Sequence, residues 1–406
     1  MYIIGTKQDK DMNILFFLRS IGFGYGGVEV VSIQLANKFF LEGHNVVLYA
    51  LHQGDSDIVD RIDKNIPLYI GHGNCASAEN IMQVREILLE HKINVAINQM
   101  GLPILPIKVL NAARENLDVT VVSFYHNDPC FNGRISDCDI AISKTDNRIK
   151  KLLWGGKRFL SKLVTQFSMR YVYEHSDYYA VLSDSYKDRF TQFTGIKHPT
   201  KLLVQTNPVT IDVVPVDLKY KQKEVIYCGR IDSQQKRVHR LIDAWALIYK
   251  DFPEWKLTIV GDGVSRKDIE LQSSRLKLKN VQFEGFRQPF EYYKRASVLA
   301  LTSEYEGFPL VLAECMSFGV VPVVYDSFSA VYDIIDNGVN GVVVPKVNGG
   351  FSTEAYAECL RIIMEDDTKR ENMELAAIET SRNYSIDFIY QQWMKIFDVS
   401  CWRKGG

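Results

Sequence analysis

The sequence predicts an α/β protein with two domains, each built around a parallel β-sheet. The chain has 406 residues, and about 200 residues per domain is the natural expectation at this length. Short apolar runs alternate with helical patterns, as is typical of βαβ units. The first run, residues 13–18, enters a glycine-rich turn that opens a helix. We expect a first domain at residues 1–215, a second at 216–385 after a polar linker, and a final helix at 386–406.

Composition and cysteine usage narrow the class of protein. Apolar residues make up 46% of the chain and charged residues 24%, as in a globular enzyme, and the net charge of −1 gives no reason to expect nucleic acid. The seven cysteines form no Cys-x-x-Cys pair, which favours reduced thiols over disulfides or zinc ligands. No apolar run is long enough to span a membrane, and residues 1–12 are unlike a secretory signal. A cytoplasmic protein is expected.

In the first half of the chain, a pair of glycines and a histidine follow predicted strands and are candidate site residues. Apolar runs predict strands at residues 13–18, 45–50, 94–97, 119–123, 140–142 and 179–182. After the first run, Gly26 and Gly27 would let backbone N–H groups approach a phosphate, although a tight turn without a ligand is the better explanation of this turn taken alone. After the fourth run, His126 stands beside Asn-Asp-Pro, at the mouth of the sheet. A structural and a catalytic role for this histidine are both open.

Residues 144–170 carry eight basic side chains against one acidic side chain, Asp146. Leucine, phenylalanine and tryptophan are interleaved with them in a pattern compatible with a helix. Such a stretch suits an anionic membrane surface. A solvated basic helix that packs its apolar face on the domain is the alternative. Nucleic-acid binding is not expected, because no groove-reading motif accompanies the charges.

The second half repeats the alternation of strands and helices. Strands are expected at residues 224–228, 255–260, 281–286, 297–301 and 320–325. Arg230 and Lys236 follow the first of them. Two cations at a strand end can neutralise the charge of a departing diphosphate, although a basic pair on the surface is the simpler explanation.

The stretch from residue 303 to 319 lies between two apolar strands. A helix from Pro309 to Gly319 is predicted, because proline favours the first helical position and glycine the C-terminal end. Glu306 then lies in the loop at the carboxyl end of a strand, where ligands bind in parallel sheets, and Glu314 lies within reach. Two carboxylates and a helix N-terminus suit a polyhydroxyl ligand with an anionic group. A loop acid and an acid near a helix start are the alternative interpretation.

The run Glu306-Gly307-Phe308-Pro309, with Glu314 and the Asn-Gly pairs at 337–341, resembles the signature of the retaining nucleotide-sugar glycosyltransferases of family 4. The resemblance is densest at residues 225–345. It implies the GT-B fold, in which two Rossmann-like domains face each other across a cleft. It also implies that the first domain faces the acceptor, that the second binds the nucleotide sugar, and that the final helix returns to the first domain.

The resemblance implies roles for single residues. Glu306 would position the donor sugar, Glu314 would hold the ribose, and His126 would orient the sugar or the acceptor hydroxyl. Further donor contacts would come from Gly26, Gly27, Gly261, Phe308, Pro309 and Leu310.

Arg230 and Lys236 would be the phosphate-binding pair of this family. Their spacing is one residue longer than the commonest form, which leaves Arg237 as a rival of Lys236. With a helix N-terminus beside them, these cations would stabilise the charge on the departing diphosphate. No metal ion is therefore expected, and the Asp-x-Asp triplets at 55–57 and 137–139 are interpreted as loop acids.

These inferences predict a retaining, metal-independent glycosyltransferase that needs no cofactor. It would move a sugar from a nucleoside diphosphate donor, its co-substrate, to a glycan or lipid-linked acceptor. If residues 144–170 bind lipid, the enzyme would sit peripherally on the inner face of the membrane. The alternatives are a nucleotide-sugar epimerase or phosphorylase on the same fold, and a sugar-nucleotide-binding protein without catalysis. The presence of Glu306, Arg230 and Lys236 argues against the last of these.

Overall fold

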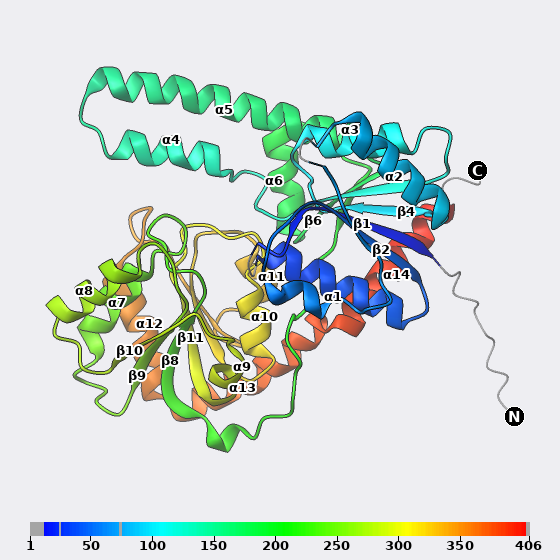
Figure 1. Ribbon diagram of the computed structural model, residues 1–406. Coiled ribbons are helices and arrows are strands. Elements are labelled where there is room, and N and C mark those ends of the chain that lie inside the picture. Colours follow the sequence, from blue (N-terminus) through cyan, green and yellow to red (C-terminus); the bar gives the residue numbers. More distant parts are fainter. Residues whose placement is uncertain (1–11, 24–25, 73–74, 403–406) are drawn as a thin grey trace, which may run out of the picture. The chain divides into compact units, whose positions relative to one another are not determined.

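The computed structural model describes residues 12–23, 26–72 and 75–402. The chain divides into two compact units (Figure 1), each with a parallel sheet of its own. The first unit consists of Met1–Val181, Arg189–Gln205 and Tyr390–Gly406. The second consists of Leu182–Asp188 and Thr206–Ile389.

The first unit is built on a seven-stranded sheet in the order β3-β2-β1-β4-β5-β6-β7. Every pairing in it is parallel. Side chains of the interior strand β1, such as Leu15 and Phe16, are fully buried, which is why this strand is a continuous apolar run instead of an alternating one. The strands are β1 (Asn13–Ile21), β2 (Asn45–Gln53), β3 (Leu68–Ile70), β4 (Val95–Asn98), β5 (Thr120–Tyr125), β6 (Tyr178–Val181) and β7 (Leu202–Val204).

Helices cover this sheet. The later turns of the last helix of the chain, from Tyr390 onward, also belong to this unit. Phe39 packs edge-on against Tyr390 with the ring centroids 5.3 Å apart, and His44 Nε2 lies 2.9 Å from the Tyr390 hydroxyl. The helices and the 3-10 turn of this half are α1 (Gly27–Leu41), η1 (Asp57–Arg61), α2 (Ala78–Glu90), α3 (Ile104–Ala113), α4 (Gly133–Ser143), α5 (Arg148–His175), α6 (Ser185–Thr194) and α14 (Ile386–Trp402). No described helix combines the length and the apolar composition that crossing a bilayer requires.

The second unit is built on a six-stranded sheet in the order β10-β9-β8-β11-β12-β13, again all parallel. Its strands are β8 (Gln222–Cys228), β9 (Lys256–Val260), β10 (Val281–Gly285), β11 (Ala296–Leu301), β12 (Val321–Tyr325) and β13 (Val342–Val344). Its helices and 3-10 turns are η2 (Leu218–Tyr220), α7 (Val238–Ile248), α8 (Arg266–Arg275), α9 (Phe290–Arg295), α10 (Leu310–Met316), α11 (Val331–Ile334), α12 (Thr353–Glu365), α13 (Asp367–Ser381) and η3 (Arg382–Tyr384).

Two local predictions need correction. Residues 140–142, predicted as a strand, lie in α4, where Ile135 and Cys138 are buried three positions apart. This is helical spacing, and a run of three apolar residues is too short to distinguish the two structures. The helix predicted from Pro309 to Gly319 is shorter: Pro309 is the N-cap of α10, and the helix ends at Met316.

Both sheets have a topological switch point, where successive connections leave in opposite directions. It lies between β1 and β4 in the first unit and between β8 and β11 in the second. In open parallel sheets, ligands bind outside the carboxyl ends of the strands at such a point. Arg230 follows β8 and Glu306 follows β11, so the second switch point carries the residues that the sequence singled out.

Candidate functional site

The loop after β8 is organised around Asp232. Its Oδ1 accepts hydrogen bonds from the backbone N–H groups of Gln235 (2.6 Å) and Lys236 (3.2 Å), and its Oδ2 accepts one from Arg230 Nε (2.9 Å). Burial opposes the charge on Asp232, but these hydrogen bonds outweigh it and lower the pKa of the carboxyl group. The loop therefore has one defined shape, with the Arg230 side chain 64% exposed at its edge.

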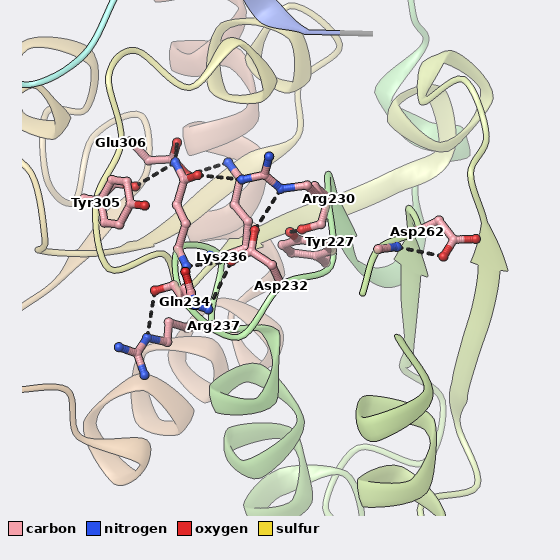
Figure 2. Close-up of polar contacts among 11 residues, drawn as sticks. Tyr227, Arg230, Asp232, Gln234, Lys236, Arg237, Asp262, Tyr305 and Glu306 are labelled. Atoms are coloured by element: carbon pink, nitrogen blue, oxygen red, sulfur yellow. Dashed lines mark hydrogen bonds and ion pairs between the residues drawn. The ribbon is translucent and has the colours of Figure 1, made fainter. Parts of the chain in front are cut away.

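Lys236 meets Glu306 in a buried ion pair (Figure 2). Lys236 Nζ lies 2.6 Å from Glu306 Oε1, and the two side chains are 17% and 6% exposed. Gln235 Nε2 lies 3.4 Å from the second oxygen, Oε2, of the same carboxylate. The structure thus brings together two residues that are 70 positions apart and that the sequence assigned to one site.

Arg237, the rival of Lys236, points elsewhere. It caps α7 with φ of 52°, and its Nε donates to the carbonyl of Gln234 at 3.0 Å and lies 3.6 Å from Glu304. Figure 2 shows Lys236 directed toward Glu306 and Arg237 directed away from it. The backbone at Arg237 is left-handed, which is uncommon for a residue other than glycine.

The loop that carries Glu306 is held by residues that sequence reasoning missed. The Tyr186 hydroxyl lies 2.9 Å from the carbonyl oxygen of Glu306 and 2.7 Å from that of Gly307, and Tyr186 is fully buried. Gln235 Nε2 donates to the carbonyl of Tyr305 at 3.2 Å. No local pattern marks Tyr186, which belongs to a distant part of the chain. Asp232 does have a local signal, because an aspartate two to four positions before free N–H groups often organises a turn.

Glu314 is buried in α10, with 5% of its surface exposed. Its Oε1 accepts a hydrogen bond from the Thr210 hydroxyl and its Oε2 one from the Tyr293 hydroxyl at 3.2 Å. Burial raises the pKa of this carboxyl group, and the two hydroxyl donors oppose the rise. The contact of Glu314 with a ribose stays a prediction.

The second unit also contains the other residues that were predicted to contact the donor. Phe308 is 6% exposed and packs against Tyr384, with the ring centroids 5.4 Å apart. Leu310 opens α10 after Pro309. A side chain at Gly261 would place its Cβ 1.8 Å from the carbonyl oxygen of Gly229, so this glycine lets the turns after β8 and β9 approach closely.

In the first unit, Gly26 is the N-cap of α1 and Gly27 is its first residue. The φ angle of Gly26 is −76°, and a Cβ added there would meet no atom within 4 Å. Neither strain nor crowding in the described structure therefore requires a glycine at position 26. The open space around its backbone is compatible with the predicted approach of a phosphate.

His126 directly follows β5, and Gln99 directly follows β4. His126 Nε2 lies 2.6 Å from Gln99 Oε1, and the imidazole stacks on Phe124 with centroids 4.6 Å apart. Burial lowers the pKa of His126 to about 3, so the ring is neutral at physiological pH. Sequence reasoning missed Gln99, whose only signal is a polar side chain at a strand end.

Among the described residues, no group of three or more His, Cys, Asp or Glu side chains is placed to hold a metal ion. Asp139, in one of the two Asp-x-Asp triplets, pairs with Arg158 at 2.5 Å.

Two family models match the chain. Residues 25–213 match the model for Glycosyltransferase Family 4, and residues 212–380 match the model for Glycosyl transferases group 1.

Relatives of known activity include bacterial enzymes that build glycans. The chain is 26% identical, over 95% of its length and 98% of the relative's, to a Campylobacter jejuni enzyme named GalNAc-alpha-(1->4)-GalNAc-alpha-(1->3)-diNAcBac-PP-undecaprenol alpha-1,4-N-acetyl-D-galactosaminyltransferase. It is 32% identical to the lipopolysaccharide 1,6-galactosyltransferase of Salmonella typhimurium, over 41% of this chain and 48% of that one.

Solved structures share the fold. Anabaena HepE in complex with UDP superposes with a TM-score of 0.72 at 18% identity, covering 96% of this chain and 100% of that one. The pneumococcal O-GlcNAc transferase GtfA in complex with UDP and GlcNAc also gives 0.72, at 12% identity, covering 96% and 99%.

Proposed function

This chain belongs to the family 4 glycosyltransferases, which have the GT-B fold, and we propose that it transfers a sugar from a UDP-sugar donor with retention of anomeric configuration. The observation that carries the proposal is the Lys236–Glu306 ion pair at the switch point of the second sheet, with Arg230 on the same loop. A cation pair and a carboxylate at this position suit a donor with a diphosphate and a hydroxylated sugar.

In the proposed mechanism, cationic side chains contact the diphosphate and a carboxylate contacts the sugar. As the bond between the sugar and the diphosphate breaks, negative charge grows on the phosphate oxygens and positive charge on the sugar ring. Arg230 and Lys236 would stabilise the departing diphosphate, a role that does not call for a metal ion. Glu306 would hold the sugar hydroxyls, and its negative charge would favour the oxocarbenium-like ring.

The donor and acceptor are proposed from the relatives. HepE and GtfA were solved with UDP, and the Campylobacter jejuni relative is named for an undecaprenol-pyrophosphate-linked glycan. We therefore propose a UDP-sugar as the donor and a polyprenyl-pyrophosphate-linked glycan as the acceptor.

Mass spectrometry after incubation with a panel of UDP- and GDP-sugars and polyprenyl-linked glycans tests this proposal. The expected product is the acceptor extended by one or more sugars, with the donor's anomeric configuration seen by NMR. The Glu306→Gln variant is the negative control. An altered donor sugar formed without acceptor would indicate an epimerase, and sugar phosphate released by added phosphate would indicate a phosphorylase.

A membrane contact through α5 is part of the proposal. The apolar side chains on one face of this helix are at least 45% exposed. A solvated basic helix would instead pack its apolar face on the domain. The exposed residues are Ile149, Leu152, Leu153, Phe159, Leu160, Leu163, Val164 and Phe167. Exposed lysines at 150, 151, 157 and 162 flank this face. Figure 1 shows α4 and α5 extending together beyond the sheet of their unit.

This combination of an apolar stripe with basic flanks matches an anionic lipid surface. The apolar face would enter the headgroup boundary, and each flanking lysine would contribute about 1 kcal/mol near anionic lipid. A surface of this kind would hold the enzyme beside an acceptor that is itself anchored in the membrane.

Liposome co-sedimentation tests the contact. The parent should bind phosphatidylglycerol-containing vesicles and lose binding as salt rises. A variant with Lys150, Lys151, Lys157 and Lys162 changed to Gln should bind less. The matched control changes Lys250, Lys267, Lys279 and Lys346, four exposed lysines of the second unit, and should bind like the parent. Equal binding to neutral vesicles would contradict the proposal.

A further inference from the structure

The end of β4 is tied firmly to the end of β5. Asn98 Nδ2 donates to the Ser123 hydroxyl at 2.9 Å, and Gly101 N–H donates to the carbonyl of Phe124 at 2.8 Å. A Cβ at Gly101 would lie 2.6 Å from that same carbonyl oxygen, so the two strand ends are as close as backbone allows. Gln99 N–H is bound to the carbonyl of Phe17 at 2.9 Å. The backbone of Gln99 is therefore fixed relative to β5.

His126 is fixed on two sides. One face of its imidazole stacks on Phe124 at an interplanar angle of 18°, and its Nε2 lies 2.6 Å from Gln99 Oε1. Gln99 is 6% exposed, so water competes little for this hydrogen bond. Neither the ring plane nor the position of Nε2 can change without breaking one of these contacts.

The hydrogen bond also decides which nitrogen carries the proton. An amide oxygen only accepts, so Nε2 must donate, and the neutral ring then keeps its lone pair on Nδ1. In the described part of the chain, Nδ1 has no hydrogen-bond partner. Burial, with no contribution from a charged neighbour, lowers the pKa of His126, and Asp128 is paired with Arg189 at 2.6 Å.

We propose that Gln99 is a positioning residue that holds His126 in the Nε2–H tautomer and leaves Nδ1 to accept a hydrogen bond from a sugar hydroxyl. This inference rests on the proposed function and on the role that the family resemblance implies for His126, which is to orient the donor sugar or the acceptor hydroxyl. A neutral acceptor suits this place, because a protonated imidazole would repel the positive charge that grows on the sugar ring. The hydroxyl that reaches Nδ1 is then selected by the geometry that Gln99 imposes.

Two substitutions separate the positioning role from a merely structural one. Gln99→Glu keeps an acceptor at Nε2, so the tautomer should persist, but its charge should raise the pKa of His126. Transfer should then fall at low pH and recover at high pH. Gln99→Leu removes the acceptor, so transfer should fall about ten- to a hundredfold at every pH. Gln53→Leu, at the exposed end of β2, is the matched control and should leave the rate unchanged.

The tautomer itself is measured without any turnover. Long-range ¹⁵N–¹H correlation spectra of protein labelled at histidine show which ring nitrogen is protonated, and the His126→Asn variant assigns the signal. The expected result is Nε2–H in the parent and in Gln99→Glu, and a mixture in Gln99→Leu. An Nδ1–H tautomer in the parent, or Gln99→Leu with parental rates, would overturn the proposal. If no donor or acceptor supports transfer, the proposed function fails, and the spectra still decide the tautomer.

Discussion

At the scale of single residues, the ion pair of Lys236 and Glu306 is the centre of the candidate site. Their N–O distance is 2.6 Å, and both side chains are largely buried. A phosphate oxygen that enters the site would compete with Glu306 for the ammonium group, because both anions accept charge-assisted hydrogen bonds.

Changing Lys236 to Met should lower kcat about 10²- to 10³-fold, because losing one contact to developing charge costs about 3 kcal/mol in the barrier. The matched control is Arg237→Met, since Arg237 contacts Gln234 and Glu304 instead of Glu306. Steady-state kinetics of sugar transfer measure both variants. A larger loss of kcat in the Arg237 variant would show that Arg237, and not Lys236, contacts the phosphate.

Glu314→Ala should weaken UDP binding about tenfold or more, because a hydrogen bond to a charged group contributes about 1.5–3 kcal/mol. Isothermal titration calorimetry with UDP measures the affinity. Thr210→Val removes a protein hydroxyl that Glu314 now binds while leaving the carboxylate in place, and it should retain most of the affinity. Parental affinity in Glu314→Ala would remove this residue from the nucleotide site.

At the scale of elements, the loop between β11 and α10 is positioned by the first turn of α6. Tyr186 lies in that turn, and its hydroxyl is within hydrogen-bond distance of two successive carbonyl oxygens of the loop. The hydroxyl has one proton to share between them. The position of the Glu306 backbone thus depends on an element that is remote in the sequence.

Tyr186→Phe should lower both stability and kcat, because two buried carbonyl groups lose their donor. The expected destabilisation is about 1–3 kcal/mol, and the freer loop should reduce kcat more than it raises KM. Thermal unfolding and kinetics of the same preparation measure the two effects. Tyr220→Phe, at a position that is 70% exposed, is the control. Unchanged kcat in Tyr186→Phe would show that the loop holds its shape without this hydroxyl.

At the scale of the whole molecule, a buried charge cluster makes stability depend on pH. Lys221 Nζ donates to the carbonyls of Tyr293 and Ala296 at 2.8 and 2.9 Å, and Arg370 Nε lies 3.8 Å from Glu374 Oε1. Burial raises the pKa of Glu374 to about 7, and Lys221 and Arg370 only partly oppose this rise.

The sign of the effect follows from proton binding. The ordinary pKa of Glu374 is 4.5, so between pH 4.5 and about 7 the folded protein binds more protons than the unfolded chain. The contribution of Glu374 to stability should therefore fall as pH rises through this window, by up to about 3 kcal/mol. Glu374→Gln stays neutral and should lack this decrease. Thermal midpoints from pH 5 to 8 measure it, with the exposed Glu379→Gln as control. A parallel decline in the parent and Glu374→Gln would assign the dependence to other groups.

Local pattern in the sequence predicted the longer strands of both sheets and the position of several candidate site residues at strand ends, but it did not predict the three-residue strands β3, β7 and β13. Continuous apolar runs such as residues 14–18 and 297–301 predict buried parallel strands. Because the carboxyl ends of such strands meet at one edge of a sheet, Arg230 and Glu306 were expected together at the edge of the second sheet and His126 at that of the first; each follows a strand end. The sequence motif around Glu306 was also sufficient to predict the family.

Only the tertiary structure decided which of these residues touch. It placed Lys236 against Glu306 and Arg237 near Glu304, placed Gln99 against His126, and placed Tyr186 against the Glu306 loop across 120 positions of sequence. Strand order and register set such contacts, and both depend on the packing of the complete sheet. Residues 140–142 show the same limit, because three apolar residues fit a strand or a helix equally well until their neighbours in α4 and α5 are in place.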